Sequence, residues 1–134
     1  MALQIIRNDY NEIEIGCLFW YSSKDQKGSS IMIIVYSING APIRLTTERW
    51  EHIILRHPEM VGEKDKVVET LTYPDLIQKG DYVTLIAIKF YNETPLTSKY
   101  LVVVYKEINK IDGFVLTAYF TSKPSERREI LWKH

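Results

Sequence analysis

The sequence YLVVVYKEINKIDGFVLTAYFT, residues 100–121, contains two runs rich in β-branched and aromatic residues, separated by NKIDG. Those residue types favour strands, and the composition of NKIDG is typical of a turn. A similar run, DYVTLIAIKFY, precedes the turn sequence NETP. We therefore expect three consecutive antiparallel strands over residues 82–91, 100–106 and 114–121.

The last of these strands has two faces of different character. Alternation predicts that Leu116, Ala118 and Phe120 contact the core and that Thr117 and Tyr119 lie on the opposite face. A face of threonine and tyrosine beside an apolar face most often simply lies in water. The same residues also suit a site that binds a polar ligand.

Two helices are expected before these strands. The first begins at LTTERW, where Thr46 or Thr47 can cap free backbone N–H groups. It ends before Pro58, because the residue before a proline favours extended geometry. The second spans about residues 63–72 and is ended by YPD. Helices beside these strands indicate an α+β fold, with the helices packed on an antiparallel β-sheet.

The chain reads as a single domain, residues 1–134, in three parts. Residues 1–42 form an N-terminal β-hairpin extension: EIEIGCLFWYSS alternates like a strand, KDQKGSS is a turn, and IMIIVYSI is the second strand. Residues 43–121 form the core of the domain. Residues 122–134 are a basic tail with a local excess of two positive charges.

Composition excludes several classes of protein. The 134 residues carry 17 basic and 17 acidic side chains, which argues against a protein that coats nucleic acid through bulk charge. No apolar run reaches membrane-spanning length, and the N-terminus lacks the order of a signal peptide. A single cysteine leaves no internal disulfide and no cysteine-based zinc site. We expect a cytoplasmic protein with no membrane partner.

Candidate functional groups gather on the first helix. A helical wheel places Trp50, Ile53, Ile54 and His57 on one stripe and Glu48, His52 and Arg56 on the other. A histidine can take and return a proton near neutral pH, an arginine can hold a phosphate, and hydroxyl groups can hydrogen-bond either. The ordinary alternative is that His52 is a surface residue and that His57 caps the helix beside Pro58.

These groups suffice for metal-free cleavage of RNA, in which the ribose 2′-hydroxyl attacks its own phosphate. The sequence has no glycine-rich phosphate loop, no GxSxG and no three ligands at metal spacing, so we expect neither cofactor nor metal. We expect His52 and Arg56 to be the catalytic pair and His57 to assist or carry the second proton. His52 reaches the strands only if the sheet curls around the helix flank or a second molecule supplies the facing surface.

The ordered set RLTTERWEHIILRHPEM, ETLTYPDLI, YLVVVYKE and FVLTAYFT resembles the barnase–EndoU–colicin–RelE-like nuclease superfamily, and within it the phage- and bacterial-toxin-associated branch. The resemblance covers residues 43–121. It implies helices against a four- or five-stranded antiparallel sheet, and a metal-independent ribonuclease that acts as a toxin in a toxin–antitoxin or phage-conflict system. Implied partners are RNA and an antitoxin or immunity protein, and a homodimer is left open.

By position, the resemblance also implies which residues form the site. The catalytic candidates are His52, Arg56, His57, Thr117 and Tyr119. The candidates for binding substrate are Lys89, Thr121 and Lys123. A different hypothesis fits the same pattern: a catalytically inert copy of this fold that binds a protein partner. Convergence of the helix and strand residues on one accessible cleft would favour the nuclease.

Overall fold

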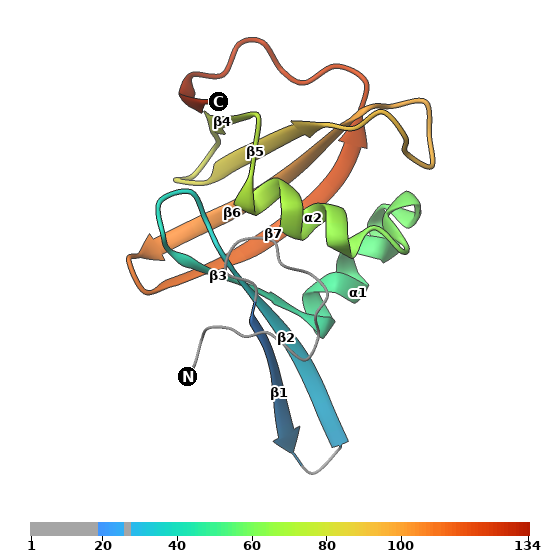
Figure 1. Ribbon diagram of the computed structural model, residues 1–134, viewed down its shortest axis with the longest axis vertical. Helices are drawn as coiled ribbons and strands as arrows, with labels where there is room; N and C mark the ends of the chain where they lie inside the picture. Colours follow the sequence, from blue (N-terminus) through green and yellow to red (C-terminus); the bar gives the residue numbers. More distant parts are fainter. Residues whose placement is uncertain (1–18, 26–27) are drawn as a thin grey trace.

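The computed structural model describes residues 19–25 and 28–134, which form an α+β fold (Figure 1). In this part of the chain, eight strands make one sheet in the order β1-β2-β3-β7-β6-β5-β4-β8. The elements are β1 Phe19–Asp25, β2 Gly28–Tyr36, β3 Pro42–Thr46, α1 Thr47–Arg56, η2 Pro58–Met60, α2 Lys64–Thr72, β4 Leu76–Lys79, β5 Leu85–Phe90, β6 Tyr100–Asn109, β7 Asp112–Thr121 and β8 Ile130–Lys133.

The three expected strands are confirmed as β5, β6 and β7, which pair antiparallel in sequence order. The expectation of a wholly antiparallel sheet is wrong, because β3 and β7 run parallel where Arg44 lies opposite Phe114. The parallel pair follows from the chain path: after β3, both helices and three strands intervene before β7 returns beside β3. The sheet is also larger than the four or five strands that the resemblance implies.

Local signals set the limits of the first helix. The Thr46 hydroxyl accepts a hydrogen bond from the Arg49 backbone N–H at 3.0 Å, so Thr46 is the N-cap. The helix ends at Arg56, and His57 before the proline has φ −132° and ψ 78°. Both ends were expected from the sequence, and α2 begins within one residue of its expected start.

The main core lies between the helices and one face of the sheet, because the apolar side chains of both elements meet there. Trp50 and Ile53 of α1 and Val67 and Leu71 of α2 are buried against the strands. Ile54 is only partly buried, at the margin of this core. Figure 1 shows both helices over the middle of the sheet, with β1 and the far half of β2 extending beyond them.

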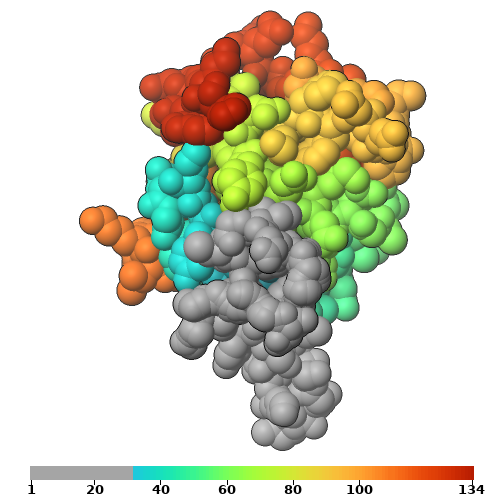
Figure 2. Space-filling model, in the orientation of Figure 1, coloured from blue at the N-terminus to red at the C-terminus, as the bar shows by residue number. Residues whose placement is uncertain are grey.

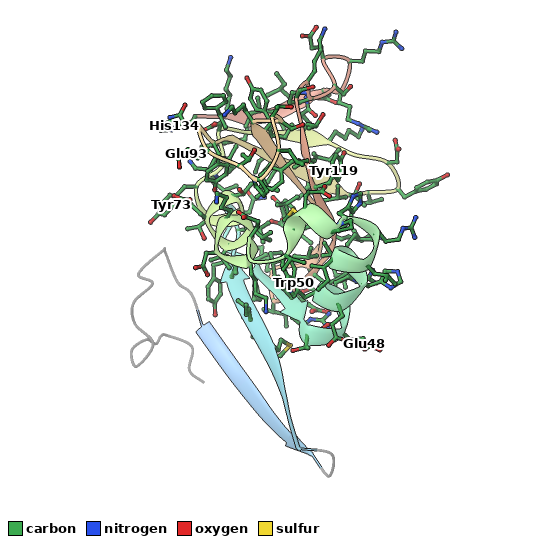
Figure 3. All side chains as sticks on the ribbon, turned by 90° about the vertical axis from the view of Figure 1, so that its right-hand side faces the viewer. Glu48, Trp50, Tyr73, Glu93, Tyr119 and His134 are labelled. Atoms are coloured by element: carbon green, nitrogen blue, oxygen red, sulfur yellow. The ribbon has the colours of Figure 1, made fainter. Side chains whose placement is uncertain are left out.

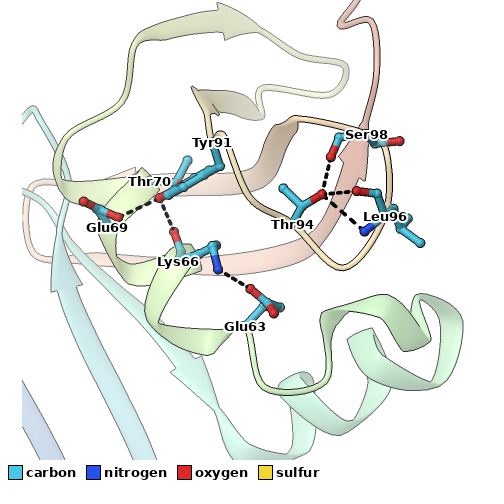
Figure 4. Close-up of polar contacts among 8 residues, drawn as sticks. All are labelled: Glu63, Lys66, Glu69, Thr70, Tyr91, Thr94, Leu96 and Ser98. Carbon is cyan, nitrogen blue, oxygen red and sulfur yellow. Dashed lines mark hydrogen bonds and ion pairs between the residues drawn. The ribbon is translucent and has the colours of Figure 1, made fainter.

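A tyrosine ties the loop after β5 to α2 (Figure 4). The Tyr91 hydroxyl lies 2.9 Å from Glu69 Oε1, 3.2 Å from the Lys66 carbonyl oxygen and 3.2 Å from Thr70 Oγ1. The Tyr91 hydroxyl can donate its one proton to Glu69 or to the Lys66 carbonyl oxygen. The Thr70 hydroxyl can in turn donate a hydrogen bond to the Tyr91 oxygen. The contact holds α2 against the sheet at the edge of the main core.

The opposite face of the sheet carries a smaller apolar cluster. Its buried members are Ile86, Ile88 and Val102. Packed against them and partly exposed are Leu76, Tyr100, Val104 and Tyr119. We call this surface the second face. It holds aromatic side chains that stay accessible to solvent or a ligand.

A β-bulge changes which side chains of β7 lie on each face of the sheet, so they do not follow simple alternation. Thr117 lies opposite Val104 and Val115 lies opposite Tyr105, so Leu116 is an extra residue in the ladder. Val115 therefore joins the main core, and the expectation that Leu116 faces it is wrong. Beyond the bulge the expected facing holds, with Ala118 and Phe120 in the main core and Tyr119 on the second face.

Both ends of the described chain extend the sheet. The expected N-terminal hairpin falls partly on residues 1–18 and 26–27, outside the described residues, while β1 and β2 pair antiparallel with Asp25 opposite Gly28. The basic tail supplies β8, which pairs with β4. Figure 2 shows the red C-terminal segment against the yellow-green β4 region at the top of the molecule. Among the described residues, no helix has the length and apolarity needed to cross a membrane.

Candidate functional site

The end of α1 and the middle of β7 meet through a pair of rings. The imidazole of His57 stacks on the phenol of Tyr119, with 5.5 Å between ring centroids and 30° between their planes. β3 pairs with β7 only near Phe114. Beyond the bulge, α1 and η2 lie beside β7 where β3 does not pair with it. His57 therefore reaches a residue of the second face although its helix packs on the other face.

Arg49 fastens α1 to the bulged part of β7. Its Nη1 donates a hydrogen bond to the carbonyl oxygen of Leu116 at 3.3 Å. Leu116 is the extra residue of the β-bulge, and the helix supplies a cation that donates to its carbonyl group. Sequence reasoning did not select Arg49, because nothing local in the sequence indicates a bulge at Leu116.

The environment of His57 is polar and open. Its Nδ1 lies 3.8 Å from Glu59 Oε2, and its side chain is about one-third exposed (34%). At this distance the two atoms do not form a hydrogen bond, so Glu59 provides a nearby negative charge at the Nδ1 edge of the ring. Glu59 follows the proline directly, so η2 fixes this carboxylate near the ring.

His52 lies apart from this pair. It is exposed, and with Thr46, Glu48 and Arg49 it lines a shallow polar cavity beside the first turns of α1. Figure 3 shows Glu48 and Tyr119 toward opposite ends of this helix. The structure therefore does not bring His52 close to the strand residues, contrary to the expectation from the sequence. His57 makes that contact.

Arg56 and Thr117 flank the ring pair in sequence. Arg56 is the last residue of α1, is exposed and makes no ion pair with any described residue. Thr117 lies on β7 two residues before Tyr119, after the bulge, and is half-buried. Each of them is therefore close in the chain to one member of the ring pair.

Lys89 lies elsewhere. Its Nζ donates to the Tyr73 carbonyl oxygen at 2.8 Å and is 3.7 Å from Asp75 Oδ1. With Tyr73, Trp132 and His134 it lines a separate cavity of about 490 Å³. In Figure 3, Tyr73 and His134 lie on the side of the molecule away from Tyr119. The structure gives Lys89 a role in holding the β4–β5 region together.

The other expected binding residues lie where β7 leads into the tail. Lys123 is exposed, and its backbone N–H lies 3.3 Å from Thr121 Oγ1, so Thr121 forms a local turn. Arg128, which sequence reasoning did not single out, forms a two-pronged ion pair with Asp81. The Asp81 hydrogen bond and charge raise the pKa of Arg128, and the Tyr119 hydroxyl adds to this in small part. Arg128 therefore ties the tail to the β4–β5 turn.

The residues that the structure describes contain no cluster of three or more histidine, cysteine or carboxylate side chains placed to hold a metal ion. The chain matches no protein-family model, no curated protein and no solved structure.

Proposed function

We propose that the protein is a metal-independent RNA endonuclease whose site is the His57–Tyr119 junction. The observation that carries the proposal is the stacking of the imidazole on the tyrosine ring across the open edge of β7. It brings a proton acceptor and a hydroxyl group together on a surface that also holds exposed aromatic side chains. The resemblance to toxin-associated nucleases supports the same reading, and we propose on that basis a role in a toxin–antitoxin or phage-conflict system.

The proposed reaction uses side chains alone. His57 Nε2 takes the proton of a ribose 2′-hydroxyl, and the freed oxygen attacks the adjacent phosphorus. The bond to the 5′-oxygen breaks, and this oxygen takes a proton from the Tyr119 hydroxyl. Solvent then removes the extra proton from His57 and returns one to Tyr119, which restores both groups. The products are a 2′,3′-cyclic phosphate and a 5′-hydroxyl. Arg56 stabilises the charge on the phosphate oxygens in the transition state.

This assignment exchanges the roles expected from the sequence. His57 becomes the base, and His52 becomes a surface residue of α1. Glu59 places a carboxylate 3.8 Å from Nδ1 of His57, on the edge of the ring away from Nε2. Thr117 supplies a second hydroxyl beside Tyr119, whereas Lys89 takes no part.

A chimeric oligonucleotide tests the chemistry. The RNA strand should be cut in EDTA, and replacement of the ribose 5′ to each cut by deoxyribose should prevent cutting there. Cleavage that requires Mg²⁺ or Mn²⁺, or that continues in all-DNA strands, contradicts the mechanism. A folded chain that cuts no RNA but binds a protein partner would support the inert-copy hypothesis instead.

A further inference from the structure

A cavity of about 360 Å³ opens on the second face, where the tail crosses the sheet. Its walls and floor include Leu76, Ile88, Tyr100 and Pro124, with Gln78 at the side and Lys123 at the rim. The volume falls in the range of small-ligand pockets. The remaining lining is mostly polar and includes Asp75, Ser122, Ser125, Glu126 and Arg128. Apolar side chains beside hydrogen-bonding groups suit a planar ring that carries hydrogen-bonding edges.

Gln78 is the unusual residue of this cavity, because it is a polar side chain only 4% exposed. Its Nε2 donates to the Ser125 carbonyl oxygen at 2.7 Å, which fixes the orientation of the amide. The amide oxygen has no hydrogen-bond partner in the described part of the chain. Among the described residues the Tyr105 hydroxyl is the one fully buried side-chain polar atom without a partner, so the Gln78 oxygen stays accessible to water or to a ligand in the cavity. A base edge with an N–H group would donate to it.

Tyr100 connects this cavity to the proposed cleavage site. Val102 lies opposite Tyr119, and Tyr100 is two residues before Val102 on the same face. Diagonal neighbours on a sheet lie about 7–8 Å apart. Tyr100 also packs edge-on against Phe90, with 5.3 Å between ring centroids. The cavity therefore begins next to the ring pair, at the distance of a neighbouring nucleotide.

We propose that this cavity binds one unstacked base of single-stranded RNA, next to the phosphate that is cut. The proposal rests on the nuclease function above and names its substrate class. The base stacks on Tyr100 and donates an N–H to Gln78. Asp81 neutralises Arg128, Lys89 pairs with Asp75, and Glu126 offsets Lys123 at the rim. Recognition therefore depends on the base more than on phosphate charge.

Mononucleotides test the cavity separately from cleavage, because they contain no internucleotide bond. The four ribonucleoside 3′-monophosphates are titrated into the ¹⁵N-labelled protein and followed by NMR. At least one should shift the Gln78 side-chain amide together with the backbone signals of Tyr100 and Ser125. The matching nucleoside should bind with similar affinity.

Three variants sharpen the test. Tyr100→Ala should weaken binding about tenfold or more, whereas Tyr100→Phe should bind like the wild type because it keeps the ring. Tyr73→Ala, an exposed tyrosine of the separate cavity, is the control and should bind normally. Ser125→Trp blocks the cavity from an exposed position and should abolish binding even if Tyr100→Ala fails to fold.

The proposal is overturned if none of the four nucleotides binds, if the shifts centre on Tyr73 and Trp132, or if Ser125→Trp binds normally. Binding with the expected variant pattern in a protein that cuts no RNA would refute the nuclease function and leave the base site standing. Cleavage of RNA without mononucleotide binding would refute the base site and leave the nuclease function standing.

Discussion

At the scale of single residues, the partly buried Tyr91 and the fully buried Tyr105 differ in the hydrogen bonding of their hydroxyl groups. Tyr91 is hydrogen-bonded by Glu69, Thr70 and the Lys66 carbonyl group. Tyr105 is fully buried in the main core, and its hydroxyl has no hydrogen-bond partner among residues 19–25 and 28–134. A buried polar group without a partner loses its hydration and gains nothing in return.

Replacing each tyrosine by phenylalanine should therefore have opposite effects. Tyr105→Phe should leave the free energy of unfolding unchanged or raise it by up to about 1 kcal/mol, because it removes an unsatisfied group. Tyr91→Phe should lower it by about 1–3 kcal/mol, because Glu69 and Thr70 lose their partner. Urea unfolding of the two variants measures both. A clear loss in Tyr105→Phe would show that its hydroxyl has a partner.

The same tyrosines predict a loss of stability in alkali. Burial raises the pKa of both hydroxyls, so the folded state favours the neutral phenol. In the unfolded chain they ionise near pH 10. Their contribution is thus complete below about pH 10 and is lost as the pH rises through the folded-state pKa values. Between pH 9 and pH 11, the double Tyr→Phe variant should lose less stability than the wild type; an equal loss would contradict this.

The roles of the two histidines show how far single residues can be read from sequence. A wheel for a regular helix places His57 on the core stripe, away from His52. The chain leaves helical geometry at His57, where φ is −132°, and the open edge of β7 lies beside it. Pro58 predicts the end of the helix. Only the tertiary structure reveals that Tyr119 stands opposite the ring.

At the scale of secondary structure, elements with strong local signals were predictable. Thr46 and Pro58 mark the ends of α1, and turn sequences separate β5, β6 and β7. The bulge at Leu116 was not predictable, because it depends on the register with β6 and on Arg49 from another element. β4 and β8 were missed because each has four residues, too few to show a period.

The turn between β4 and β5 is strained. Tyr82 and Val83 have φ values of 54° and 63°, and both are exposed, at 90% and 78%. The Thr84 N–H donates to the Asp81 carbonyl oxygen at 3.1 Å, which closes a two-residue hairpin turn. Positive φ at both central positions favours Asn–Gly, and a β-branched residue there is unfavourable.

Changing Tyr82→Asn together with Val83→Gly should therefore raise the free energy of unfolding by about 1–2 kcal/mol. Gly40→Ala provides the opposite control. Gly40 has φ 84° and open space around it, so a Cβ there meets only backbone strain and should lower stability by about 1 kcal/mol. Thermal unfolding of both variants measures the effects. A double variant less stable than the wild type would mean that Tyr82 and Val83 stabilise the fold.

At the scale of the whole molecule, the sequence indicated an α+β domain but not its complete sheet. The pairing of β8 with β4 joins residues about fifty positions apart, and the parallel contact of β3 with β7 joins residues seventy positions apart. Such pairings depend on the global path of the chain. They matter for the site, because the tail that leads to β8 also forms a wall of the cavity on the second face.

The zero net charge predicts weak dependence of RNA binding on salt. Asp81 pairs with Arg128 and Glu126 offsets Lys123, which leaves Arg56 as the cation of the proposed site that can neutralise a phosphate. A single strand should then give a slope of about −1 in a plot of log K against log salt concentration. Fluorescence anisotropy with an all-DNA strand, which lacks the attacking hydroxyl, measures the slope without cleavage. A slope steeper than about −5 would indicate a larger basic surface than the second face offers.

The direct test of the cleavage site compares two histidines of the same segment. His57→Ala and His52→Ala are made singly, checked for folding by circular dichroism, and assayed on the same RNA in EDTA. His57→Ala should slow cleavage by about 10² to 10⁴, because it removes the general base, whereas His52→Ala should cut at the wild-type rate. If a folded His57→Ala variant cuts RNA normally, or if only His52→Ala loses activity, the His57–Tyr119 junction is not the catalytic site.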